Sequence, residues 1–157
     1  MRLLILGTGG MAAQHAKHFA AIEGVTVVGG VDVDPARLAT FNATHNIPNG
    51  FASLDAAIAW GEFDAVANVT PDSIHHPTSI AALNAGKHVF CEKPLATDYA
   101  KALEMTEVAE KAGLINMVNL TYRNVAELQA ARTLVMSGKI GAVKHVEASY
   151  LQSWLVM

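Results

Sequence analysis

The segment Glu92-Lys93-Pro94 combines residues that can do chemistry, and it directly follows a short apolar run, residues 89–91. If that run is a strand, the segment lies at its carboxyl end, where open α/β sheets bind ligands. Lysine offers a compact cation whose pKa falls readily on burial, so the side chain can act as proton donor or acceptor. The proline fixes the backbone, and a Lys-Pro bond is one of the few that can be cis. A strand end with a turn and two solvated charges fits equally well, so the segment alone leaves both interpretations open.

A group of small residues follows residues 2–6, a mostly apolar, β-compatible run. The group fits the pattern G-x-G-x-x-[GA], and all six residues are candidate cofactor contacts: Gly7, Thr8, Gly9, Gly10, Met11 and Ala12. Gly7 permits a tight turn, Gly9 lets backbone approach a dinucleotide diphosphate, and Ala12 lets the next helix pack closely on the strand. A helix predicted over residues 10–22 would point its unpaired N–H groups at that diphosphate.

A carboxylate lies where a dinucleotide site needs one. Asp32 ends the next apolar run, 25 residues after Gly7, and an acid near this spacing binds the ribose hydroxyls. Asp34 precedes a proline and is predicted instead to cap a helix over residues 35–45. The charge of Asp32 would repel a 2′-phosphate, which favours NAD as the cofactor. NADP stays open as the alternative, because Arg37 could soften that repulsion.

Composition indicates one α/β domain with ample core-forming material. The 157 residues are 52% hydrophobic and 16% charged, with a net charge of −3. The charge and the absence of a Lys/Arg run give no reason to expect nucleic acid as a partner. The single cysteine is compatible with a reducing compartment. No stretch is long and apolar enough to span a bilayer, so the predicted location is the cytoplasm and no membrane partner is expected.

The elements that must position these residues alternate along the chain. Further strands are predicted over three runs: residues 64–69, 88–91 and 114–119. Helices are predicted over three segments, the first opened by Pro77 and the second capped by Thr97: residues 77–85, 97–112 and 125–137. This succession predicts an α/β fold with a largely parallel, doubly wound sheet.

The character of the chain changes after residue 141. Residues 142–157 have an extended pattern and are predicted to be the first strand of a second, truncated α/β domain. A lone strand with aromatic residues would be an exposed edge, which single domains avoid. Either the chain continues in a longer polypeptide, or this strand pairs with another chain. The predicted division is a dinucleotide-binding domain, residues 1–120, and the start of a substrate and oligomerisation domain, residues 121–157.

With these segments in order, the chain resembles the glucose–fructose oxidoreductase / inositol dehydrogenase (Gfo/Idh/MocA) family. Five motifs carry the resemblance: Gly7-Thr-Gly-Gly-Met-Ala12, Val69-Thr-Pro-Asp-Ser-Ile-His75, Gly86-Lys-His-Val-Phe-Cys-Glu-Lys-Pro94, Asn119-Leu-Thr-Tyr-Arg123 and Ser137-Gly-Lys-Ile-Gly141. The Glu-Lys-Pro segment is the most discriminating. The resemblance implies a Rossmann domain that binds NAD or NADP, followed by a second α/β domain that carries substrate contacts and supports homo-oligomers through its sheet.

The resemblance also implies roles for individual residues. It places six of them along the cofactor cleft: Thr70, Pro71, His75, Glu92, Lys93 and Arg123. Lys93 is the catalytic candidate, because it would flank the nicotinamide and touch the substrate hydroxyl or carbonyl oxygen. The family's catalytic histidine and its neighbouring aspartate belong to the second domain and have no counterpart in these 157 residues. The chain is therefore expected to carry at most half of an active site.

The implied function is an NAD(P)-dependent oxidoreductase acting on a secondary alcohol or carbonyl of a sugar, polyol or related small molecule. Oxidation of an alcohol requires a group that accepts the hydroxyl proton, which a lysine beside the nicotinamide can do in part. The competing hypothesis is a sensor or scaffold that binds the dinucleotide and performs no turnover.

Three other reactive side chains are assigned to packing. His15 and His18 lie three residues apart on the first predicted helix, but no third ligand is evident, so no metal site is predicted. Surface or groove packing is expected for both. Cys91 has no partner base in the sequence and is predicted to be a buried small hydrophobe.

Overall fold

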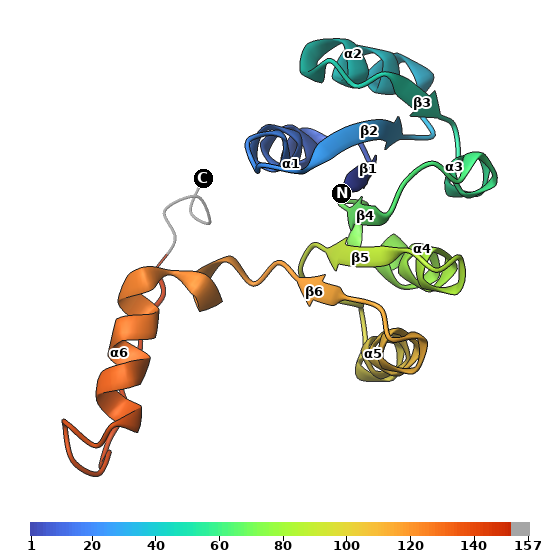
Figure 1. Ribbon diagram of the computed structural model, residues 1–157. Helices are drawn as coiled ribbons and strands as arrows, with labels where there is room; N and C mark the ends of the chain where they lie inside the picture. The colour runs from blue at the N-terminus through green and yellow to red at the C-terminus, as the bar shows by residue number, and fades with distance from the viewer. Residues whose placement is uncertain (152–157) are drawn as a thin grey trace. The chain divides into compact units, whose positions relative to one another are not determined.

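Residues 1–151, which this computed structural model describes, contain one six-stranded sheet in the order β3-β2-β1-β4-β5-β6 (Figure 1). All five strand pairs are parallel. The strands are β1 (Arg2–Leu6), β2 (Thr26–Val31), β3 (Asn49–Phe51), β4 (Ala65–Asn68), β5 (His88–Cys91) and β6 (Asn116–Val118). Strand order reverses between β1 and β4, so the carboxyl ends of these two strands flank the crevice where such sheets bind ligands.

Helices cover both faces of the sheet. They are α1 (Gly10–Ala20), α2 (Pro35–His45), α3 (Leu54–Trp60), α4 (Asp72–Asn84) and α5 (Tyr99–Ala112). In Figure 1, α1 and α2 lie on one side of the strands, while α3, α4 and α5 lie on the other. The predicted α/β, doubly wound architecture is confirmed.

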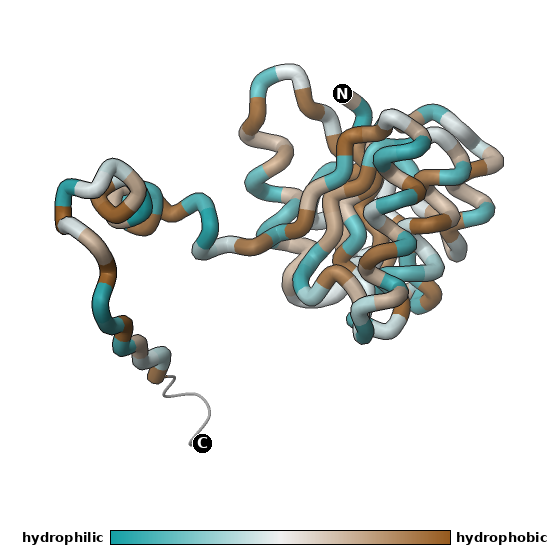
Figure 2. Tube along the Cα trace, turned by 90° about the horizontal axis from the view of Figure 1, so that it is seen from below, coloured by the Kyte–Doolittle hydropathy of each residue, from teal (hydrophilic) through white to brown (hydrophobic). Residues whose placement is uncertain are grey.

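The central strand β1 explains why the sheet has two cores. Leu3 and Ile5 pack with residues of α1 and α2, while Leu4 and Leu6 pack with residues of α3, α4 and α5. Side chains alternate between the two faces of a strand, so a strand with helices on both sides must be apolar throughout. Hydrophobic stretches accordingly run through the strands in Figure 2.

The predicted cap of α2 is confirmed. One oxygen of Asp34 accepts hydrogen bonds from the backbone N–H groups of Ala36 and Arg37, both at 3.0 Å. Helix α5 differs from its prediction, because Asp98 rather than Thr97 is the capping residue and accepts from the Lys101 N–H at 3.0 Å. Both caps satisfy N–H groups that a helix start leaves unpaired.

Helix α4 begins five residues earlier than predicted. It starts at Asp72 and contains Pro77, which was expected to open it. A proline inside a helix costs about 3 kcal/mol, since it removes one hydrogen bond and crowds the preceding turn. Burial of the apolar residues Ala82 and Leu83 and the hydrogen bonds of the buried His75 ring act against that cost. Tertiary packing therefore decided a boundary that local propensity placed wrongly.

The second compact unit of the chain is Leu120–Met157, separate from Met1–Asn119. It contains a 3₁₀ helix, η1 (Thr121–Asn124), and α6 (Ala126–Met136). The predicted strand is wrong for residues 142–151, which form no strand, and its remainder, residues 152–157, lies outside the described residues. A strand needs a neighbour to pair its backbone groups, and no described strand pairs with this segment. Among residues 1–151, no helix has both the length and the apolar character that crossing a membrane requires.

Candidate functional site

Gly7 makes the turn that leaves β1. Its N–H donates to the Val31 carbonyl oxygen at 2.8 Å, and its φ is +86°, a conformation that side chains other than glycine rarely adopt. A Cβ at this position would lie 2.9 Å from the Val69 carbonyl oxygen. Only glycine therefore lets β1, β2 and the end of β4 converge here.

The start of α1 is open. No side chain caps the helix at Gly9, and a Cβ built on Gly9 or Gly10 would meet no atom within 4 Å. Met11 is exposed, while Ala12 is fully buried against the sheet. The first-turn N–H groups and the positive end of the helix dipole thus face space that an anion can enter.

Asp32 braces the glycine-rich turn. Its Oδ2 accepts from the Thr8 N–H at 2.9 Å and from the Thr8 hydroxyl at 2.7 Å. Its Oδ1 accepts from the Asp34 N–H at 2.9 Å. A carboxylate oxygen accepts about two hydrogen bonds, so Oδ1 retains one acceptor position that no hydrogen bond within residues 1–151 fills. Burial raises the pKa of Asp32, but these hydrogen bonds and the nearby Arg37 lower it by a larger amount. The pKa of Asp32 therefore lies below its ordinary value.

An open groove runs between the first turn of α1 and helix α2. Gly9, Gly10 and Ala13 line it from α1, and Arg37 and Thr40 line it from α2. The Arg37 guanidinium lies 3.0 Å from an oxygen of Asp34 and 3.9 Å from Asp32. The groove therefore runs from the open amino terminus of α1 to Arg37, which lies beside Asp32.

The loop from β4 to α4 is tied to the segment after β5. His75 is only 1% exposed, and its ring nitrogens lie 2.8 Å from the Thr70 carbonyl oxygen and 2.7 Å from the Pro94 carbonyl oxygen. The Thr70 hydroxyl donates to Asn68 Oδ1 at 2.6 Å. Pro71 is the residue that precedes α4. The predicted cleft residues of this loop are thus held next to Glu92-Lys93-Pro94.

Glu92 is buried and satisfied by three donors. Oε1 lies 2.7 Å from His15 Nε2 and accepts from the Asn119 amide at 2.7 Å, while Oε2 accepts from the Lys93 N–H at 3.1 Å. Burial raises the pKa of Glu92, and the bonds from Asn119, His15 and Lys93 outweigh that effect, so the pKa is lowered. The Lys93 side chain is exposed, and the Lys93–Pro94 bond is cis.

The lowered pKa predicts how Glu92 contributes to stability. A depressed folded-state pKa means that stabilisation is present above the ordinary value of 4.5 and is lost as pH falls through the folded pKa. Glu92→Gln should lower the free energy of unfolding at pH 7 by about 1–3 kcal/mol, because it removes charge-assisted hydrogen bonds. The difference between variant and wild type should shrink as pH falls below 4.5. Urea denaturation at several pH values measures it.

The control for that experiment is Glu107→Gln, on the exposed side of α5. It should leave the pH dependence of stability unchanged. A Glu92→Gln difference that stays constant from pH 7 to pH 3, values bracketing the ordinary pKa of 4.5, would show that the ionised carboxylate contributes nothing specific.

The role of His15 was missed from the sequence. The prediction was packing at the surface or in a groove, whereas the ring is buried and paired with Glu92, 77 residues away. A local signal existed: His15 lies three residues after Ala12 and one before Ala16, both on the buried face of α1. Spacing could reveal the burial but not the distant partner. Asn119, which completes the contacts of Glu92, opens one of the family motifs in the sequence, but no role was assigned to it.

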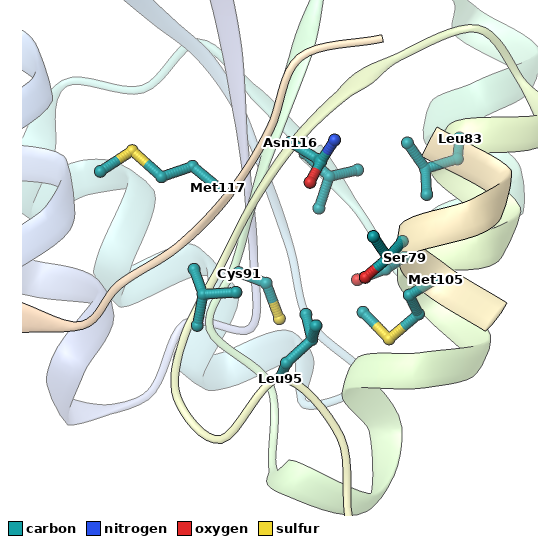
Figure 3. A pocket seen from close by; sticks show the side chains of 10 residues that line it. Ser79, Leu83, Cys91, Leu95, Met105, Asn116 and Met117 are labelled. Atoms are coloured by element: carbon teal, nitrogen blue, oxygen red, sulfur yellow. The ribbon is translucent and has the colours of Figure 1, made fainter. Parts of the chain in front are cut away.

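Cys91 is buried, as predicted. It lines a pocket of about 20 Å³ together with Ser79 and Met105, and Figure 3 shows these side chains gathered between β5 and the helices. Burial raises the pKa of the Cys91 thiol to about 11, so the thiol stays protonated and unreactive at neutral pH. No cluster of three or more metal-ligating side chains occurs in residues 1–151.

Arg123 is the one predicted site residue outside the first unit. It lies in η1, and its carbonyl oxygen accepts a hydrogen bond from the Gln129 amide. All the other predicted site residues lie at or beyond the carboxyl ends of β1, β2, β4 and β5, the same edge of the parallel sheet.

These features define the class of the protein as a dinucleotide-binding Rossmann domain. An uncapped helix follows a glycine turn, and a carboxylate at the end of β2 lies beside it, so the residues present fit a dinucleotide. The sequence model of the GFO_IDH_MocA family, described as an oxidoreductase family with an NAD-binding Rossmann fold, matches residues 1–120. The chain belongs to this family. The predicted family and the predicted NAD cofactor class are confirmed at that level.

Individual relatives agree with the family assignment. An inositol 2-dehydrogenase of Leifsonia xyli subsp. xyli is 34% identical over an alignment of 167 positions, gaps included, that covers 99% of this chain and 49% of the relative. A 1,5-anhydro-D-fructose reductase of Ensifer adhaerens is 33% identical over 138 residues, covering 83% of this chain and 41% of the relative. Scyllo-inositol dehydrogenase from Lactobacillus casei, solved with NAD(H) and scyllo-inositol, superposes with a TM-score of 0.83 at 29% identity, covering 90% of this chain and 42% of that one. The chain thus spans less than half the length of these relatives.

Proposed function

We propose that this chain is the cofactor-binding half of an NAD-dependent oxidoreductase that interconverts a secondary alcohol and a carbonyl on a sugar, polyol or related small molecule. The observation that carries the proposal is the contact between His15 of α1 and Glu92 after β5. Helix α1 presents its open amino terminus to a diphosphate, and the same helix holds the segment that contains Lys93. The phosphate site and the proton-transfer group are therefore parts of one connected structure.

Each predicted residue has a role in this proposal. Gly7, Gly9 and Ala12 bring backbone N–H groups of the turn and α1 close to the diphosphate. Asp32 accepts a hydrogen bond from the ribose, and the loop with Thr70 lines the cleft. The remaining proposed contacts are Thr8, Gly10, Met11, Pro71, His75, Glu92 and Arg123.

Lys93 carries the proposed catalysis. The bound nicotinamide supplies the hydride acceptor or donor. The exposed Lys93 side chain orients the substrate oxygen. As a neutral amine it would accept part of the hydroxyl proton during alcohol oxidation, and as an ammonium it would donate to the developing alkoxide during carbonyl reduction. A histidine and an aspartate from a second domain would complete the proton transfer.

Several parts of the proposal concern the whole protein. The boundary at residue 120 would separate the cofactor domain from a substrate domain that begins within residues 121–157. The sugar or polyol class of substrate rests on the names of the relatives, which include inositol dehydrogenases. We propose a homo-oligomer formed through the sheet of the second domain, a cytoplasmic location, and no nucleic acid or membrane partner.

Calorimetric titration of the 157-residue chain tests the cofactor assignment. We expect NADH and NAD to bind and NADPH to bind about tenfold more weakly, equivalent to about 1.4 kcal/mol, because Asp32 repels a 2′-phosphate. Turnover of polyols and sugars by this chain alone should be negligible. Absence of heat with NADH at millimolar concentration, on folded protein, would contradict the proposal.

Gly9→Val provides the matched control. A Cβ at Gly9 meets no neighbouring atom and the backbone there is extended, so the variant should fold normally. Its side chain would occupy the space proposed for the diphosphate, so NADH binding should be lost. Unchanged NADH affinity in Gly9→Val would place the dinucleotide elsewhere.

A further inference from the structure

We infer that His15 is a positioning residue for Lys93, acting through the buried carboxylate of Glu92. The inference rests on the proposed function for the catalytic role of Lys93. Its structural part, control of the Lys93 backbone by a histidine on α1, stands on the contacts of the first unit alone.

The contacts form a continuous path. His15 Nε2 lies 2.7 Å from Glu92 Oε1, and the other oxygen, Oε2, accepts from the Lys93 N–H at 3.1 Å. An ionised carboxylate only accepts hydrogen bonds, so His15 donates from Nε2. The orientation of the Glu92 side chain thus decides where the Lys93 amide is held.

Burial restricts the side chains of His15 and Glu92 to one arrangement. His15 and Glu92 are each 7% exposed, and a buried carboxylate is stable only when donors satisfy it. The Asn119 amide supplies the remaining donor to Oε1 at 2.7 Å, from just beyond β6. Glu92 therefore has one well-defined orientation, fixed from α1 on one side and from the end of β6 on the other.

Two aromatic rings fix the histidine itself. The ring of His15 stacks on Phe19 with centroids 6.0 Å apart and meets the edge of Phe90 at 5.5 Å. Phe90 lies on β5, the strand that leads to Glu92. The imidazole is held between its own helix and this strand, so its donor direction is set before any ligand binds.

This arrangement links the two parts of the proposed site. In the proposed site, the first turn of α1 contacts the diphosphate. His15, on the second turn of the same helix, contacts Glu92, which holds the Lys93 amide. A helix is stiff over this distance, so α1 fixes the position of the Lys93 backbone relative to the bound cofactor. Catalytic groups need positions accurate to about 0.5 Å, which such support provides.

Amide exchange with water measures the positioning directly. Losing the Nε2 donor in His15→Leu should free Glu92 and raise the exchange rate of the Lys93 amide by about tenfold, the effect of one lost hydrogen bond of about 1.4 kcal/mol. His15→Gln keeps a donor of similar reach and should restore most of the protection. His18→Leu, at an exposed position of the same helix, is the control and should leave the rate unchanged. The rates are measured by NMR on the 157-residue chain and compared with amides of β1.

The outcomes separate the inference from the proposed function. An unchanged Lys93 rate in folded His15→Leu overturns the inference, even if NADH binds as expected. Failure of the wild type to bind NADH would overturn the proposed function, while the exchange rates would still test the positioning. If His15→Leu does not fold, His15→Asn takes its place, because asparagine is too short to reach Glu92. Equal Lys93 rates in His15→Asn and His15→Gln would then overturn the inference.

Discussion

Gly7→Ala should destabilise the protein by about 2–5 kcal/mol and abolish NADH binding. The φ of +86° costs an L-residue about 1–2 kcal/mol. The new Cβ would also lie 2.9 Å from the Val69 carbonyl oxygen, and overpacking of this kind costs about 1–3 kcal/mol. Relief of the clash would push the turn away from the end of β4 and misplace the first turn of α1. Urea denaturation and NADH titration measure the two effects.

Gly24→Ala separates the two causes. Gly24 has a φ of +78°, close to that of Gly7, but a Cβ there meets nothing within 4 Å. This variant should lose only the conformational part, about 1–2 kcal/mol, and should bind NADH normally. Equal destabilisation of both variants would show that the close approach of Gly7 to Val69 adds nothing.

Lys93→Met should have the largest effect on catalysis. In a polypeptide that joins this chain to a substrate domain, we expect kcat to fall by about 10²–10⁴, the usual contribution of a positioned acid or base. NADH affinity should fall by no more than about tenfold, since loss of one hydrogen bond to the bound carrier is worth only about 0.5–1.5 kcal/mol and methionine fills similar space. Steady-state kinetics and NADH titration on the same preparation measure both quantities.

Two results would contradict this assignment. Equal loss of kcat and NADH affinity would make Lys93 a cofactor-binding residue without a catalytic role. Unchanged kcat would make it an ordinary surface charge. Lys101→Met is a suitable control. Lys101 is an exposed lysine on α5 that pairs with the capping residue Asp98, and its loss should not change kcat. A domain that binds NADH but shows no turnover in any such joined polypeptide would favour the sensor or scaffold hypothesis.

Local sequence signals predicted the parts of the fold that depend on neighbouring residues. The turn at Gly7, the buried small residue Ala12 and the cap at Asp34 each satisfy a requirement set within a few residues, and the structure contains all three. The doubly wound class followed from the alternation of apolar runs. Where neighbouring signals conflicted with packing, as at Pro77 in α4, the prediction was wrong.

The sequence by itself determined the family and the alternating strands and helices, because short motifs and side-chain periodicity encode them. The same motifs name the residues that we propose to bind a dinucleotide. Only the tertiary structure decided that His15 and Asn119 hold Glu92, that His75 bridges the two loops of the cleft, and that residues 142–151 form no strand. The physical reason is the same in each case. Each outcome depends on whether the folded sheet places a hydrogen-bond partner beside the residue. No local pattern specifies which distant residue supplies that hydrogen bond.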